Sequence, residues 1–253
     1  MFREIKKETR KIIFKNYKYF IFPTILHILT NCIISICCYF IFYNDGLKNW
    51  VTPQFWLWIL FLVLAYCVVL PFAKYLLFKV PALALNNIPI KFEFSFSKLI
   101  KVILIYLPLI IFGFINLFLN GLTESELYAD YGLMILFFSA LINVFEIYFE
   151  YKLFAAFYHF ALNGGTAKEA VDFSYNLMHK KFWLTVVLSF SLILWYLLIF
   201  ALGVVFITLP DINELLRICL ASVNYGVNLI FLPYLHAIRS VFIKKQIEKT
   251  ARK

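Results

Sequence analysis

The chain has 253 residues, of which 63% are hydrophobic and 20% aromatic, while only 15% are charged. A soluble domain carries about 25% charged residues, and a disordered chain carries few aromatic ones, so this composition excludes both classes. The relevant unit is instead the transmembrane helix, which needs roughly 20 apolar residues to cross the hydrocarbon core of a bilayer. The sequence therefore predicts an all-α, polytopic integral membrane protein.

Apolar runs divide the chain into three predicted parts. Residues 1–18 predict a basic amphipathic helix, because Ile5 and Ile12 fall on the face opposite the basic residues. Residues 19–243 predict a six-helix transmembrane domain, and residues 244–253 a basic cytoplasmic tail. The predicted spans lie near 19–43, 55–79, 99–119, 133–154, 182–207 and 218–243.

The net charge of +10 is distributed unevenly between the predicted loops. Segments on the side of the N-terminus hold 22 of the 24 Lys and Arg residues, whereas the opposite loops hold only Lys48 and Arg217. Cytoplasmic loops collect Lys and Arg, so we expect both termini to be cytoplasmic. Topology accounts for the basic excess, and we expect no nucleic-acid partner.

Residues 166–180 predict a second amphipathic helix, in which Thr166 and Glu169 have the spacing of a capping box. Basic amphipathic helices bind anionic lipid headgroups, although such a helix can equally well pack under the bundle. The predicted lipid-surface contacts are Lys6, Lys7, Arg10, Lys11, Lys168, Lys180 and Lys181.

Ionisable side chains inside spans are costly and often functional. Asn143, Glu146 and Glu150 fall on one helical stripe of the fourth span. Counting 1.5 Å per residue places further polar residues at a similar depth in other spans. The sequence predicts a cytoplasmic-side polar layer, which is either a water-filled vestibule or a set of structural ion pairs. Its predicted members are Asn143, Glu146, Glu150, His27, Lys74, His236 and Arg239.

Sequence motifs of common catalytic and cofactor sites are missing. The chain contains no GxxxxGKS/T, HExxH, GxSxG or GxGxxG motif. Its five cysteines fall inside apolar runs without the spacing of a metal site. We therefore expect a protein that is not an enzyme, with no cofactor, no metal site and no catalytic residue.

The second half of the chain resembles a bacterial family of multi-spanning membrane proteins known as a domain of unknown function. Similar features are the helix with Glu169-Ala170, Ser174 and Leu177-Met178, the span with Phe182-Trp183, Leu188-Ser189-Phe190, Trp195 and Gly203, and the closing Pro233-Tyr234, Ala237 and Val241-Phe242. The membrane domain of some glycerophosphodiester phosphodiesterases is distantly similar. The chain departs from the family at Ile243, where a tyrosine is expected. The resemblance implies a bacterial plasma-membrane protein and assigns no substrate.

Two functions follow from these observations as hypotheses. The first is a non-enzymatic accessory or scaffold subunit in export, envelope homeostasis or self-immunity, since catalytic motifs are missing and the predicted outer loops are short. The second is a small transporter of a lipid or amphiphile that uses the polar layer as its vestibule. A lipid-modifying enzyme inside the membrane is a third and weaker alternative. Anionic membrane lipids are the expected partners, and a membrane protein or a second copy of the chain is a further candidate.

Overall fold

The computed structural model describes residues 2–43, 51–123, 131–179, 181–190, 197–198, 201 and 214–251. Within these ranges the chain is helical and contains no strand. Among the described residues, five segments are long and apolar enough to cross a membrane: Arg3–Phe42, Pro53–Leu85, Phe96–Leu119, Leu133–Asn163 and Gly226–Ala251. The predicted all-helical fold with long apolar helices is confirmed, whereas most of the predicted span 182–207 lies outside the described residues.

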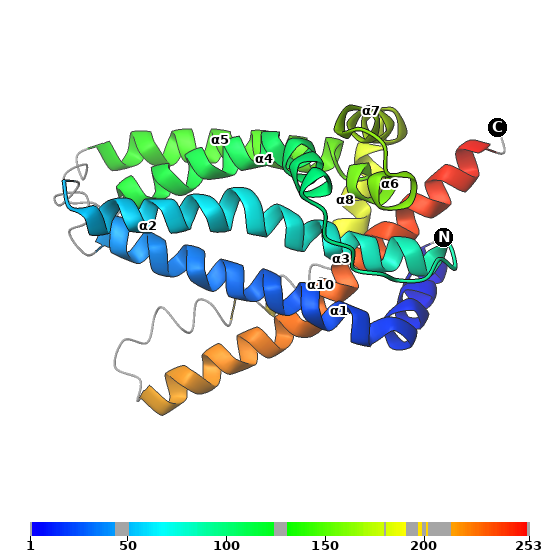
Figure 1. Cartoon of the computed structure of the whole chain (residues 1–253), viewed down its shortest axis with the longest axis horizontal. Helices are drawn as coiled ribbons and strands as arrows, with labels where there is room; N and C mark the ends of the chain where they lie inside the picture. The colour runs from blue at the N-terminus through cyan, green and yellow to red at the C-terminus, as the bar shows by residue number, and fades with distance from the viewer. Residues whose placement is uncertain are drawn as a thin grey trace.

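Helix α1 (Phe2–Cys38) contains both the predicted amphipathic helix and the first span. It continues into one π-helical segment, η1 (Tyr39–Tyr43). The first turns of α1 stand at a steep angle to the remainder (Figure 1). In these turns Ile5, Thr9 and Ile12 are buried, while Lys7 and Arg10 are exposed. The basic segment is thus continuous with the span, but it runs in a different direction.

The second apolar segment consists of α2 (Pro53–Leu64), η3 (Ala65–Val69) and α3 (Leu70–Leu85). Thr52 caps the start of α2 by accepting a hydrogen bond from the Phe55 amide at 3.4 Å. Pro71 has no N–H, and just before it the Leu70 amide bonds to the Ala65 carbonyl, five residues back. This wider turn rotates the side chains of α3 relative to those of α2.

Helices α4 (Phe96–Thr123) and α5 (Gly132–Lys152) lie side by side over much of their length (Figure 1). A turn connects α5 to α6 (Ala156–Asn163), and α7 (Ala167–Met178) follows. The predicted capping box at the start of α7 is confirmed, since Thr166 and Glu169 each bond to the other's backbone amide. Ser174 of α7 accepts a bond from the Ala155 amide at 2.9 Å, which holds α7 against that turn.

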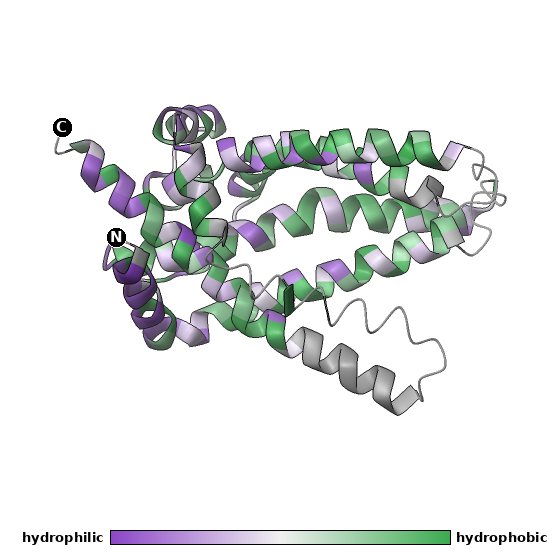
Figure 2. Cartoon of the chain, turned by 180° about the vertical axis from the view of Figure 1, so that it is seen from behind, coloured by the Kyte–Doolittle hydropathy of each residue, from purple (hydrophilic) through white to green (hydrophobic). Residues whose placement is uncertain are grey.

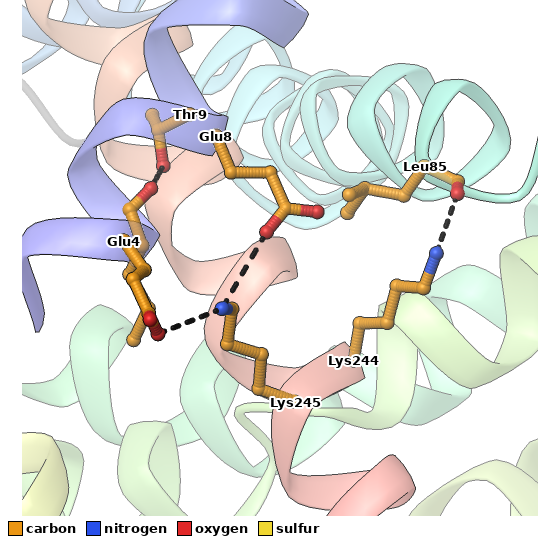
Figure 3. A network of polar contacts seen from close by, with 7 residues as sticks. Glu4, Glu8, Thr9, Leu85, Lys244 and Lys245 are labelled. Carbon is orange, nitrogen blue, oxygen red and sulfur yellow. Dashed lines mark hydrogen bonds and ion pairs between the residues drawn. The ribbon is translucent and has the colours of Figure 1, made fainter. Parts of the chain in front are cut away.

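Helix α8 (Phe182–Phe190) covers the described start of the predicted fifth span, and α10 (Glu214–Ala251) covers the sixth. α10 continues as helix through most of residues 244–253, which were predicted as a tail. Figure 3 shows Lys245 of α10 between two glutamates of α1, with Nζ 3.5 Å from Glu4 and 3.7 Å from Glu8. Lys244 donates to the Leu85 carbonyl at 2.7 Å, which satisfies a free acceptor at the end of α3.

Both chain ends therefore lie at the same end of the bundle (Figure 1). Hydrophilic residues gather at this end, around the first turns of α1 and the last turns of α10, whereas the long helices are mostly hydrophobic (Figure 2). The largest buried cluster is also centred here and joins α3, α4, α6, α7 and α10. α5, by contrast, exposes most of its apolar side chains, as a lipid-facing helix would.

Candidate functional site

Five of the seven predicted polar-layer residues line one cavity of about 250 Å³. The five residues are His27, Lys74, Glu150, His236 and Arg239. They come from α1, α3, α5 and α10, and apolar side chains of α4 and α6 complete the wall. We call this space the histidine cavity. A cavity of this volume holds several water molecules or a small polar headgroup.

The local structure of α1 and α3 explains how polar side chains reach the cavity. Thr24 and Thr30, on either side of His27, satisfy their hydroxyls on carbonyls four residues back in α1. Such bonds allow polar residues to be buried in a spanning helix without partners on other helices. Lys74 follows Pro71 and the wide turn η3, so its direction depends on that rotation.

The charged groups of the cavity are only partly neutralised. Arg239 forms an ion pair with Glu150 at 2.9 Å and lies over the Phe154 ring at 5.2 Å from its centroid. Lys74 donates a hydrogen bond to the Tyr106 hydroxyl and lies 4.9 Å from the centroid of that ring. The Glu150 side chain is 48% exposed and that of Arg239 is 15% exposed, so Arg239 is the more enclosed partner of this ion pair.

The two histidines are the unusual members of this site. His27 is 8% exposed and His236 is 3% exposed. Among the described residues, neither Nδ1 atom has a hydrogen-bond partner. Buried polar atoms are nearly always paired, and leaving one unpaired costs about 1–3 kcal/mol. Both histidines line the cavity, where water or a polar ligand group would supply the missing hydrogen-bond partners.

The other two predicted members lie elsewhere on α5. Glu146 faces α4, with its Oε1 3.2 Å from the position that a Cβ would take at Gly113. The Asn116 side-chain amide of α4 forms two hydrogen bonds with α5. Its Nδ2 donates to Asn143 Oδ1 at 2.8 Å, and its Oδ1 accepts from the Ser139 hydroxyl at 2.5 Å. The predicted stripe on α5 therefore divides into two parts. Glu150 lines the cavity, whereas Asn143 and Glu146 face α4.

The cavity is suited to a small anion. Lys74 and Arg239 are the cations among its lining residues, and Glu150 is the one lining carboxylate, while Glu146 interacts with Lys74 electrostatically from beside the cavity. The histidine Nδ1 atoms are further potential donors. The described residues contain no group of three His, Cys, Asp or Glu side chains that could hold a metal ion. The arrangement can hold the charged headgroup of an amphiphile, or carry protons between its histidines and Glu150.

Comparison with known proteins gave no match. No family model matches the chain, and no curated protein or solved structure is significantly similar to it. The resemblance to the bacterial membrane family therefore stays a prediction, and the site must be interpreted from its own geometry.

The predicted lipid-surface residues fall into two groups. Lys6, Lys7, Arg10 and Lys11 line a shallow groove along the first turns of α1, where Phe14 is 85% exposed beside them. Lys168 is exposed on α7, Lys181 is half-buried, and Lys180 lies outside the described residues. Of the predicted lipid-surface residues that the structure describes, those on α1 therefore lie together on one surface, whereas Lys168 and Lys181 lie apart from them.

Sequence reasoning missed Tyr106 and Phe154, which contact the two cations of the cavity. Both are aromatic residues in a chain that contains 30 Phe and 16 Tyr. Nothing in the sequence separates them from the aromatic residues that only fill the core. Their importance follows from the packing of α3 and α10 against their neighbours.

Proposed function

We propose that the chain is a non-enzymatic bacterial plasma-membrane protein, with both termini cytoplasmic, that binds an anionic amphiphile and carries its headgroup through the histidine cavity. The observation that carries this proposal is the pair of buried, unpartnered Nδ1 atoms beside Lys74. A scaffold without a ligand would be expected to pair or exclude such atoms. Of the two predicted functions, the transporter gives these two atoms a direct role in binding.

The basic surface on α1 supports the same proposal. Its cations attract the headgroups of anionic lipids, and the exposed Phe14 side chain can insert beside them at the level of the acyl chains. α1 also provides His27, so a single helix runs from this surface to the cavity. An anionic amphiphile gathered at the surface would therefore be concentrated near the cavity that binds its headgroup.

A lipid-flipping assay on the full chain tests the proposal. The chain is reconstituted in phosphatidylcholine vesicles that contain a trace of fluorescent phosphatidylglycerol, and dithionite is added outside. We expect the wild-type chain to expose the inner fluorescent pool, and Lys74→Met to slow this about tenfold, because one cation of the cavity is lost. Lys249→Met, which removes an exposed lysine near the end of α10, is the matched control and should behave as wild type.

Two results would contradict the proposal. One is a wild-type rate equal to that of vesicles without protein, which would favour the accessory subunit. The other is a Lys74→Met rate equal to that of wild type, which would show that the cavity takes no part in the movement.

A further inference from the structure

A second pocket, of about 580 Å³, lies beside the histidine cavity and shares no lining residue with it. Its wall is formed by α3, the connection between α3 and α4, the start of α4, and the end of α6 with its following loop. These segments lie at the end of the bundle that holds both chain ends (Figure 1). The volume is within the range of about 300–1,000 Å³ that small-molecule sites occupy.

Basic side chains surround this pocket. Lys79, Lys91, Lys98 and Lys101 line it, and Glu93 is the one acidic residue among the lining residues. Lys98 bonds to Glu93 at 3.2 Å, and this hydrogen bond lowers the pKa of the Glu93 carboxyl below its usual value. The carboxylate is therefore ionised at neutral pH and neutralises one of the four lysines. The remaining positive charge faces the pocket without an anion.

Lys79 is the decisive residue, because it is buried. It lies on the same stripe of α3 as Tyr75 and Leu83, one turn from each, and only 8% of it is exposed. No hydrogen bond or ion pair of Lys79 Nζ is found among the described residues. Its ammonium group therefore opens onto the pocket, where the one acidic lining residue, Glu93, attracts it electrostatically but is already bound to Lys98.

The other walls suit an organic ligand that carries the anion. Tyr75 and Phe160 form a buried aromatic floor, with their ring centroids 5.6 Å apart. On another side Gly164 and Gly165 have φ values of 65° and 81°, which only glycine adopts without strain. The backbone of this loop therefore lines the pocket without side chains, which permits close approach of a ligand.

We propose that this lysine pocket binds the phosphate group of a phosphorylated small molecule or of a phospholipid headgroup. Several ammonium groups around one site match the charge of phosphate, for which lysine is a common ligand. The aromatic floor would hold the organic part of the same molecule. The inference stands apart from the proposed function, because the two sites have different lining residues and can be inactivated separately.

Calorimetric titration of the full chain in a neutral detergent with inorganic pyrophosphate tests the pocket. We expect Lys79→Met and Lys98→Gln each to weaken binding about tenfold or more. Glu93→Gln should strengthen it, because Lys98 is released from its carboxylate partner. Lys249→Met removes the same charge far from the pocket and should have no effect. The Lys98 side chain is 43% exposed, so its variant keeps the test valid if Lys79→Met fails to fold.

A second arm identifies the source of the phosphate. The full chain is placed in nanodiscs of phosphatidylcholine and phosphatidylglycerol and is then analysed by native mass spectrometry. Retained phosphatidylglycerol that pyrophosphate displaces, and that Lys98→Gln loses, would indicate a lipid headgroup. Pyrophosphate binding without such retention would indicate a soluble phosphorylated ligand. The proposal is overturned if the wild type binds neither probe, if Lys249→Met weakens binding as much as Lys98→Gln, or if neither Lys79→Met nor Lys98→Gln weakens it.

Discussion

Replacing His236 by leucine distinguishes a histidine that binds a ligand from one that supports the fold. The Nδ1 atom of His236 is unpartnered, and its burial costs about 1–3 kcal/mol. The ring contacts Phe78 edge-on at 4.6 Å, a contact worth about 0.5–1.5 kcal/mol. Leucine is similar in volume to histidine, and it removes both the cost of the unpartnered Nδ1 atom and the ring contact with Phe78. We expect His236→Leu to leave the free energy of unfolding unchanged or to raise it by up to about 2 kcal/mol, while lipid flipping is lost.

His159→Leu provides the matched control for this substitution. The His159 ring stacks on Phe173 at 4.2 Å, and its Nδ1 accepts a hydrogen bond from Asn163 at 3.0 Å. Losing both contacts should lower the free energy of unfolding by about 1–2 kcal/mol. Unfolding is followed in mixed micelles by far-UV circular dichroism as the fraction of sodium dodecyl sulfate rises. If His236→Leu destabilises the chain as much as His159→Leu does, His236 is a structural residue and the reasoning is wrong.

Three further predictions concern the cavity and its support. A double-mutant cycle of Glu150→Gln and Arg239→Met should show a coupling free energy of about 1–2 kcal/mol in the same unfolding assay. This value lies between those of exposed and of fully buried ion pairs, and a coupling of zero would refute the ion pair. In a background without native cysteines, Leu109→Cys should react with a membrane-permeant, water-soluble thiol reagent, whereas Leu141→Cys, which is exposed on α5, should not. Thr166→Ala should destabilise the chain by about 1 kcal/mol through loss of the capping box, and an unchanged stability would contradict this.

The sequence was sufficient to predict the all-helical fold and a group of polar side chains, five of which line one cavity. The rise of an α-helix is constant at 1.5 Å per residue. Counting from the ends of the predicted spans therefore placed His27, Lys74 and His236 at a similar distance from the cytoplasmic side. The capping box at Thr166 was predictable for a similar reason, because it depends only on local spacing.

The packing of the helices against one another could not be predicted from the sequence. Asn143 shares a stripe with Glu150, yet it bonds to Asn116 of α4, and only the packing of α5 decides which part of that stripe faces the cavity. The lysine pocket was missed for the same reason. Its lysines come from α3, from the connection between α3 and α4, and from α4. In the sequence Lys79 resembles the other lysines near the ends of predicted spans, and only the structure shows that it is 8% exposed.

Native mass spectrometry of the chain purified gently from its own membrane tests the central claim most directly. With pyrophosphate present to displace any lipid from the lysine pocket, the wild type and Lys79→Met should retain an anionic amphiphile, while His236→Leu and Lys74→Met should lose it, because only the latter two change the histidine cavity. Retention by all four forms, or a wild type without any bound amphiphile, would contradict the claim. A partner protein at fixed stoichiometry in place of the amphiphile would establish the accessory subunit instead.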